Sequence, residues 1–444
     1  MLSTFVASAT DTLNWRTKQN QVDADIQMWD LSTLLKKIAR QTGWKVYVEQ
    51  DASTQISVKF KDLSPEEALR RLLGKLNYSK DQTNGVCRLF VYRTLAKAAT
   101  QAVAPEKKDY RIANEDLVKL KRGATNSIDE LAKKVGAKVI GRDDRIGLYR
   151  LQFDDAASAT AGLQGLTSDP SVAAADGNYS VDRPTPAQMT QVPNAAAGPA
   201  FNINPQPVAN GPIVGLVDTA VDPPSQFSPY MLTPINITGQ QDTPGSDPSH
   251  GTSMLETLLE AMPNDPSKIL PVDVYGSGES TTTYEVMEGV LAAINGGANP
   301  INLSLGGTGE STMLGDLIQE GVQKGIVFVA AAGNTPGEGQ VYPASYPGVI
   351  SVTASTQTVN GPITTTQSGS SQLASYANDP AGTEVIAPGT SLVQWNGQTW
   401  EVQGTSPATA STTGTIADLV NQNHISLSQA VDIVTRVSPA PTKQ

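Results

Sequence analysis

Three polar residues stand where an α/β sheet would place catalytic groups. Asp218 ends a run of apolar residues, His250 directly precedes a helix expected over residues 254–262, and Ser406 opens another expected helix. A serine hydroxyl is a poor nucleophile until a base removes its proton, and an imidazole is a useful base only in the right tautomer. Asp218, His250 and Ser406 can therefore supply the orienting carboxylate, the base and the nucleophile of a catalytic triad.

An oxyanion that forms during such a reaction needs hydrogen-bond donors. A helix N-terminus at Ser406 offers a free backbone N–H and a favourable dipole, and Asn334, after the apolar run 327–333, offers a side-chain amide. Each residue also has a simpler interpretation, since Asp218 or Ser406 alone could cap a helix and Asn334 could belong to a turn. A solitary histidine such as His250 is more often structural. Their occurrence together favours the catalytic interpretation.

The composition narrows the classes of protein. At roughly 100–200 residues per domain, 444 residues predict two to four domains, and 39% hydrophobic residues suffice for cores. No run approaches the ~18 apolar residues of a membrane-spanning helix, so we expect no membrane span. One cysteine, Cys87, excludes an intrachain disulfide, and two histidines, His250 and His424, argue strongly against a multi-histidine metal centre.

The charge is divided unevenly along the chain. Residues 1–200 hold 28 Lys+Arg and 23 Asp+Glu, whereas residues 201–444 hold 4 and 20. A basic first half and an acidic second half predict two parts that attract each other. The acidic half argues against nucleic acid as a partner, because phosphate backbones bind lysine and arginine.

From Gly211 onward, short and continuously apolar runs alternate with glycine-rich turns and helices. Such runs are typical of parallel strands buried on both faces. We expect strands at residues 213–217, 269–274, 300–304, 326–331, 349–352 and 384–387, with helices at 282–295 and 312–324. The fold class is therefore α/β, an open parallel sheet with helices on both faces and with functional groups at the carboxyl ends of its strands.

Two small α+β domains are expected before this sheet. In the first, helices are predicted at 30–41 and 64–76, and in the second, strand–helix–strand occurs twice, which is the ferredoxin-like split βαβ order. A proline-rich connector follows and would be exposed to proteases. The expected division is 1–14 as a signal-peptide remnant or flexible terminus, 15–95 as the first domain, 96–108 as a linker, 109–180 as the second domain, 181–210 as the connector and 211–444 as the sheet domain.

The order Asp218, His250, Asn334, Ser406 resembles that of the subtilisin-like serine proteases, the subtilases of peptidase family S8, over residues 211–444. Further matches to the family are residues 302–307, 342–347 and 385–389. The resemblance implies a serine endopeptidase in which Ser406 attacks the scissile carbonyl of a polypeptide and His250 acts as base and then as acid. Asp218 would orient His250, and the Asn334 side chain with the Ser406 N–H would bind the oxyanion.

Substrate contacts follow from the same resemblance. An edge strand would pair with the substrate backbone, and its two glycines would let that backbone approach closely. Val341 aligns where many members have glycine at the base of the primary specificity pocket, which predicts a preference for small or medium side chains before the cleaved bond. The expected substrate-binding residues are Ser304, Leu305, Gly306, Gly307, Ala332, Gly333 and Val341.

The sequence departs from the family pattern in three places. Ser253 stands where the family has a second histidine, Ala220 where glycine is usual, and Pro407 follows the serine. His424 matches no motif and is expected at the surface. No cofactor or metal is required by the predicted reaction. The family commonly binds structural calcium, but no ligands for calcium can be assigned from this sequence.

The resemblance to subtilases also implies a function for the second domain. Residues 109–180, closing with 172–179, resemble the inhibitory propeptides of subtilases, which predicts a self-inhibited zymogen with a basic-leaning propeptide docked on an acidic catalytic domain. The connector would leave through the active-site cleft, with self-cleavage within 177–200. The alternative is a permanent accessory domain.

The first domain and the N-terminus carry weaker signals. Residues 15–95, with the turn 63–69, resemble the short N-terminal domain of secretins and TonB-dependent receptors, which implies a protein partner; a generic α+β module is the alternative. Ala7-Ser8-Ala9 looks like a small-x-small cleavage site, which predicts a secreted or periplasmic protein.

Two rival functions remain open. One is a catalytically silent subtilase fold used as a binding or scaffold protein, against which the presence of all four site residues argues. The other is the related Ser-Glu-Asp peptidase class, which His250 in a His-Gly-Thr context disfavours. Activity at neutral rather than strongly acidic pH would separate the second, because the base of a triad must be unprotonated.

Overall fold

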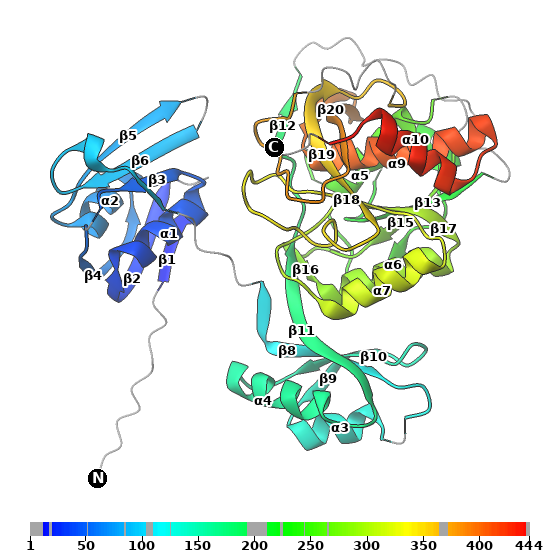
Figure 1. Cartoon of the computed structure of the whole chain (residues 1–444), viewed down its shortest axis with the longest axis horizontal. Coiled ribbons are helices and arrows are strands. Elements are labelled where there is room, and N and C mark those ends of the chain that lie inside the picture. Colours follow the sequence, from blue (N-terminus) through cyan, green and yellow to red (C-terminus); the bar gives the residue numbers. More distant parts are fainter. Residues whose placement is uncertain are drawn as a thin grey trace. The chain divides into compact units, whose positions relative to one another are not determined.

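The computed structural model divides the chain into two compact units, Met1–Asp109 and Tyr110–Gln444. Figure 1 shows the helices and strands of both units. The described residues are 12–16, 20–50, 52–83, 86–103, 110–124, 126–192, 211–222, 225–243, 245–263, 266–363 and 372–440.

Within its described residues, the first unit contains two small sheets and two α-helices, α1 (Leu31–Thr42) and α2 (Pro65–Leu73). Asp30 caps α1 and Ser64 forms a capping box with Glu67 at the start of α2, so both helices begin where the sequence signals predict. One sheet has the order β1 (Thr12–Arg16), β2 (Gln21–Asp30) and β4 (Gln55–Leu63), and the other β5 (Asn77–Thr83), β6 (Val86–Tyr92), β3 (Lys45–Val48) and β7 (Gln101–Val103). Strand β7 lies within the segment expected as a linker.

The first part of the second unit is a split βαβ domain. Its sheet has the order β16-β11-β8-β10-β9, in which the domain's own four strands follow the ferredoxin-like 4-1-3-2 arrangement. The elements are β8 (Arg111–Leu120), α3 (Ile128–Val135), β9 (Lys138–Asp143), β10 (Leu148–Gln152), α4 (Ala156–Thr167), β11 (Val172–Asp182) and, from the following domain, β16 (Ser280–Thr282). Strand β11 runs to Asp182, because its residues 172–179 pair with β8 and its last three residues pair with β16.

The remainder of the second unit is built on a nine-stranded sheet, and the expected α/β class is confirmed. Seven strands are parallel, in the order β20 (Val385–Trp395), β19 (Val349–Thr358), β18 (Phe328–Ala331), β17 (Ala298–Leu303), β13 (Ile213–Asp218), β15 (Lys268–Asp273) and β14 (Ile235–Asn236). Strands β21 (Gln398–Gln403) and β12 (Gln188–Gln191) extend it antiparallel. Strands β15 and β14 lie on one side of β13 and strands β17 to β20 lie on the other, so the topological switch point lies at the end of β13.

Helices cover both faces of this sheet (Figure 1). Val214 and Leu216 of β13 pack in the cluster that includes α5 (His250–Glu260), whereas Val217 packs with α6 (Thr283–Asn295). This alternation follows from the two-residue period of a strand. Helices α9 (Thr405–Asn423) and α10 (Leu427–Val437) share the side of α5, and α7 (Thr312–Gln323) lies beside α6.

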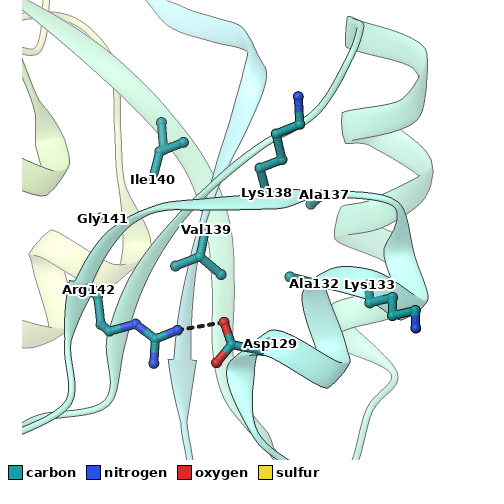
Figure 2. Close-up of a pocket in the computed structure, with 9 residues that line it drawn as sticks. All are labelled: Asp129, Ala132, Lys133, Ala137, Lys138, Val139, Ile140, Gly141 and Arg142. Atoms are coloured by element: carbon teal, nitrogen blue, oxygen red, sulfur yellow. Dashed lines mark hydrogen bonds and ion pairs between the residues drawn. The ribbon is translucent and has the colours of Figure 1, made fainter.

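A groove of about 540 Å³ lies in the split βαβ domain between α3 and β9 (Figure 2). An ion pair of 2.6 Å between Arg142 and Asp129 crosses one side of it. Its lining comes entirely from residues 129–142, and none of the expected catalytic residues contributes. The carboxyl edge of the large sheet, rather than this groove, holds the candidate site.

Candidate active site

The carboxylate of Asp218 and the imidazole of His250 meet at the end of β13. His250 Nδ1 lies 2.8 Å from Asp218 Oδ1 and 3.0 Å from Oδ2, and both side chains are almost completely buried. Helix α5 begins at His250, whereas the sequence predicted that His250 would precede the helix. The correction has a local cause: Ser249 is the N-cap and accepts a hydrogen bond from the Thr252 N–H at 3.1 Å.

Gly251 allows α5 to approach the turn after β13. A Cβ at Gly251 would lie 2.3 Å from the carbonyl oxygen of Thr219, which no other residue could tolerate. The Gly251 N–H donates to Thr219 Oγ1 at 2.8 Å, and Ser249 Oγ donates to the Ala220 carbonyl at 2.7 Å. These bonds fix the first turn of α5 against the strand end, and so hold His250 on Asp218.

Ser406 lies in the first turn of α9 and is 4% exposed. Its Oγ donates to the main-chain carbonyl of Ser304 at 3.3 Å, and Ser304 Oγ donates back to the Ser406 carbonyl at 3.1 Å. Among the described residues, His250 Nε2 has no hydrogen-bond partner. The acid–base half of the predicted triad is therefore assembled, while the serine hydroxyl is oriented toward β17. Catalytic hydrogen bonds often tighten only when substrate binds.

Asn334 is oriented by the residue before the serine. Its Oδ1 accepts from both the N–H and the Oγ1 of Thr405, at 2.8 and 3.0 Å. Because the oxygen is occupied, Nδ2 is the group left to face a ligand, and it approaches the carbonyl oxygen of Thr185 to 3.5 Å. Sequence reasoning did not identify Thr405 as a positioning residue, although it stands in the Gly-Thr-Ser motif.

The segment expected to bind substrate lies after β17. Ser304 and Leu305 are buried, and Gly307 pairs antiparallel with Tyr342 through bonds of 3.0 and 2.8 Å. The backbone of Gly307 is therefore bonded within the domain, which differs from the expected free edge at that residue. A Cβ at Gly306 would lie 2.8 Å from Val341 Cγ1.

Val341 also lies close to Gly333, another residue that was expected to bind substrate. A Cβ at Gly333 would lie 3.2 Å from Val341 Cγ2, and Val341 is 4% exposed. Gly333 has a φ of +103°, a conformation that only glycine adopts readily, and its N–H donates to Thr405 Oγ1 at 3.2 Å. Ala332 is fully buried and donates its N–H to Val352 at 2.9 Å.

The start of the expected connector crosses this edge of the sheet in an extended conformation. Residues 180–182 pair antiparallel with β16, and the Arg183 N–H donates to the Glu279 carbonyl at 2.9 Å. The Ala187 N–H donates to Gln403 at 2.7 Å, and β12 then pairs with β21, the strand that leads to Ser406. Residues 183–187 thus span the edge between two sets of main-chain bonds.

Side chains of the split βαβ domain bind the N-termini of α6 and α7. Asp176 Oδ2 accepts from Ser311 Oγ at 2.9 Å and Thr312 Oγ1 at 3.1 Å at the start of α7, where a negative charge is favoured. Arg150 bridges Glu115 of its own domain and Glu285 of α6, at 2.7 and 2.6 Å.

The split βαβ domain is not basic, contrary to the expectation from the sequence. Residues 109–180 hold 10 Lys+Arg and 11 Asp+Glu, so the positive excess of the first half lies earlier in the chain. Individual ion pairs and helix-terminus bonds, and not net charge, connect this domain to the catalytic domain.

Among the residues that the structure describes, no metal centre can be assigned. Within the described ranges no three His, Cys, Asp or Glu side chains gather as a metal site would require, so calcium remains without assigned ligands. His424 is exposed and ends α9 in the left-handed conformation, with a φ of +51°.

Comparisons with known proteins identify the family. The family model described as "Subtilase family" matches residues 209–435, which is half of the chain. The chain belongs to the subtilase family. A second model, "Fervidolysin N-terminal prodomain", matches residues 96–178 of this subtilase, which cover the split βαβ domain except for the end of β11. The protein is therefore a subtilisin-like serine endopeptidase with a prodomain, as the sequence predicted.

Named relatives agree with this assignment. The chain is 27% identical to a thermophilic serine proteinase of Bacillus sp. (strain AK1) over 326 residues, 68% of this chain and 76% of that protein. It is 33% identical to subtilisin E of Bacillus subtilis (strain 168) over 192 residues, 39% of this chain and 46% of that protein. The match thus spans about half the length of subtilisin E.

Solved structures show the same fold. The crystal structure of fervidolysin from Fervidobacterium pennivorans, a keratinolytic enzyme related to subtilisin, has a TM-score of 0.55 at 20% identity and covers 70% of this chain and 55% of that one. The epidermin leader peptide processing serine protease of Staphylococcus aureus, in a serine-to-alanine mutant form, has a TM-score of 0.52 at 17% identity and covers 72% and 92%.

Proposed function

We propose that this subtilase hydrolyses peptide bonds through Ser406, His250 and Asp218. In the reaction the Ser406 hydroxyl would leave the Ser304 carbonyl and donate to His250 Nε2, which removes its proton as the oxygen attacks the scissile carbonyl. His250 then protonates the leaving amine, and water hydrolyses the acyl-enzyme by the same steps in reverse. The observation that carries the proposal is the buried Asp218–His250 bond, because it fixes the tautomer and leaves Nε2 as the free base.

The oxyanion would be bound by Asn334 Nδ2 and the Ser406 N–H. The orientation of Asn334 by Thr405 supports this role, since an amide whose oxygen already accepts two bonds presents its NH₂ group without further reorganisation. Loss of one such donor reduces the rate by ~10²–10³-fold in enzymes of this mechanism.

The enzyme would be made as a self-inhibited zymogen. The bonds of Asp176 and Arg150 to α7 and α6 support a docked propeptide, and the extended segment 183–187 over the site supports self-cleavage within residues 177–200. A product-like segment that remains paired with β16 would block the cleft until it dissociates or is degraded.

We also propose export and a protein partner for the first unit. The Ala7-Ser8-Ala9 sequence that motivates export lies outside the described residues. In the part of the chain that the structure describes, no helix is long and apolar enough to cross a membrane. The partner of residues 15–95 rests on the resemblance to the short secretin-type domain.

Intact-mass spectrometry of the purified wild type and Ser406→Ala at neutral pH tests the proposal. We expect the wild type to split near residues 177–200 into an N-terminal piece and a catalytic piece of about 25 kDa, the mass of a domain of ~250 residues. Ser406→Ala should stay intact. Ser411→Ala is a matched control, because Ser411 is a fully buried serine on the same helix and should be processed like the wild type.

A fluorophosphonate label distinguishes the remaining outcomes. Labelling of an unprocessed wild type would mean a competent triad without self-cleavage. If neither processing nor labelling of Ser406 occurs, the scaffold function replaces the peptidase. The scaffold function would then agree with the hydrogen bond that the Ser406 hydroxyl donates to Ser304 rather than to His250.

A further inference from the structure

Arg183, in the segment that crosses the candidate site, has its guanidinium bound on three sides. Nη1 donates to the carbonyl oxygens of Gly276 and Gly278, both at 2.9 Å, and Nη2 is ion-paired with the carboxylate of Asp242. The Arg183 and Asp242 side chains are only 21% and 22% exposed. A guanidinium presents several N–H groups in a fixed plane, and these acceptors match that geometry.

The acceptors belong to a turn that the catalytic domain fixes by itself. Buried Asp273, the last residue of β15, accepts from the N–H groups of Tyr275 and Gly276, each at 2.9 Å. Gly276 has a φ of +52°, and a Cβ there would lie 2.3 Å from Thr238 Oγ1, so the turn needs glycine. The carbonyl oxygens that bind Arg183 are thus held in place by contacts that do not involve Arg183.

The main chain of Arg183 is also bound as that of a substrate residue would be. Its N–H continues the ladder between β11 and β16 by donating to Glu279 at 2.9 Å. Two residues later, the Thr185 carbonyl lies 3.5 Å from Asn334 Nδ2, the expected oxyanion donor. If Thr185 marks the residue before a cleaved bond, Arg183 is the third residue before it.

We propose that Gly276, Gly278 and Asp242 form an arginine-selective subsite for polypeptide substrates, with Asp242 as its specificity-determining residue. The inference rests on the proposed peptidase function and names the substrate class of that site. Arg183 occupies the subsite within the chain, and an arginine of another polypeptide takes it when the connector has left. The carboxylates of Asp242 and Asp273 lie on this wall of the site, which favours a cationic side chain over a neutral one.

Arginine and lysine should not be equivalent at this position. Lysine can place one ammonium near Asp242, but it cannot reach two carbonyls and a carboxylate in one plane as the guanidinium does. Glutamine loses the charge and would leave the Asp242 carboxylate without a partner. The expected order of kcat/KM is arginine, lysine, glutamine, with a ratio of about tenfold or more between arginine and glutamine.

The test uses the full chain after incubation at neutral pH and a proteome-derived peptide library, with cleaved bonds identified by mass spectrometry. We expect arginine to be enriched at the third residue before the cleaved bond. Peptides that differ only there, with arginine, lysine or glutamine, then give the kcat/KM ratios. In Asp242→Asn the arginine-to-glutamine ratio should fall toward one. Asp247→Asn is the matched control, because Asp247 is an exposed aspartate nearby that does not contact Arg183, and its ratio should equal the wild-type ratio.

The outcomes separate the two proposals. If no library peptide is cleaved and Ser406 takes no fluorophosphonate, the peptidase function itself fails. If peptides are cleaved with no preference for arginine at the third residue before the bond, the subsite inference is overturned while the peptidase function stands. A ratio that Asp242→Asn leaves unchanged overturns it as well.

Discussion

Glu256 and Glu260 lie one turn apart on α5, the helix that begins at His250. Glu256 is completely buried; its Oε2 accepts the Gln394 N–H at 2.7 Å, while Oε1 has no hydrogen-bond partner among the described residues. Burial raises the pKa of both carboxyls from 4.5 to about 8. Both are therefore protonated at neutral pH, although they ionise in the unfolded chain.

The sign of the pH dependence follows from the raised pKa. Below pH 4.5 the carboxyl is protonated in both states, and its contribution to stability is fully present. That contribution falls as the pH rises, until the folded-state pKa of about 8 is passed. Between pH 4.5 and pH 7 the loss is about 3 kcal/mol for one such carboxyl, at 1.36 kcal/mol per pKa unit.

Glu256→Gln isolates this effect. Glutamine keeps an oxygen for the Gln394 N–H and has no proton to lose, so the variant should be about 3 kcal/mol more stable than its parent at pH 7 and nearly equal to it at pH 4.5. Urea unfolding of the catalytic-domain transition at pH 4.5, 7 and 8.5 measures this, in a Ser406→Ala background that prevents self-digestion. Glu338→Gln, at an exposed site, is the control and should change little. Equal stability of Glu256→Gln and parent at pH 7 would refute the reasoning.

Two further predictions concern the pocket and the docked domain. Val341→Gly should raise kcat/KM for peptides with phenylalanine before the cleaved bond by about tenfold relative to alanine, because Val341 fills the space between Gly306 and Gly333; chromogenic peptides measure this, and an unchanged ratio contradicts it. Burial and the nearby Asp143 raise the pKa of Glu288 to about 7, so retention of the cleaved propeptide should weaken as the pH rises from 4.5 through 7. Glu288→Gln should flatten this dependence in gel filtration at pH 5 and 8.

Much of the fold could be predicted because its signals are local. The six expected strands of the catalytic sheet overlap β13, β15 and β17 to β20, because strands buried on both faces have apolar residues at successive positions. Helix α3 is the first helix of the strand–helix–strand order expected in the second domain, and Ser127 and Gly136 mark its ends. The elements that were missed, such as β21 and α10, lie outside such runs.

One missed element did carry a signal. Strands β20 and β21 form a hairpin whose turn contains Asn396 and Gly397, both with positive φ, at +50° and +75°. Asn-Gly between two extended segments is the strongest short-range hairpin signal. Strand β20 was expected to end at Ala387, yet its second half pairs with β21 and is largely buried. Pro388 and Gly389 interrupt the apolar run, so this half of β20 was missed, and so was β21, the strand that leads to Ser406.

The candidate site also has residues that could be predicted from the sequence and residues that could not. Asp218, His250 and Ser406 could be placed from the sequence because each stands at the end of an element whose position in the sheet is fixed by topology. The arginine site could not, because Arg183 and Asp242 are 59 residues apart in polar segments without periodicity. Arg183 reaches the turn at Gly276 because β11 pairs with β16. The Gly276 carbonyl faces Arg183 because the bond to Asp273 and the positive φ of Gly276 fix the turn. Motif residues can therefore identify the reaction, whereas the selectivity of this enzyme depends on contacts between segments that no local pattern links.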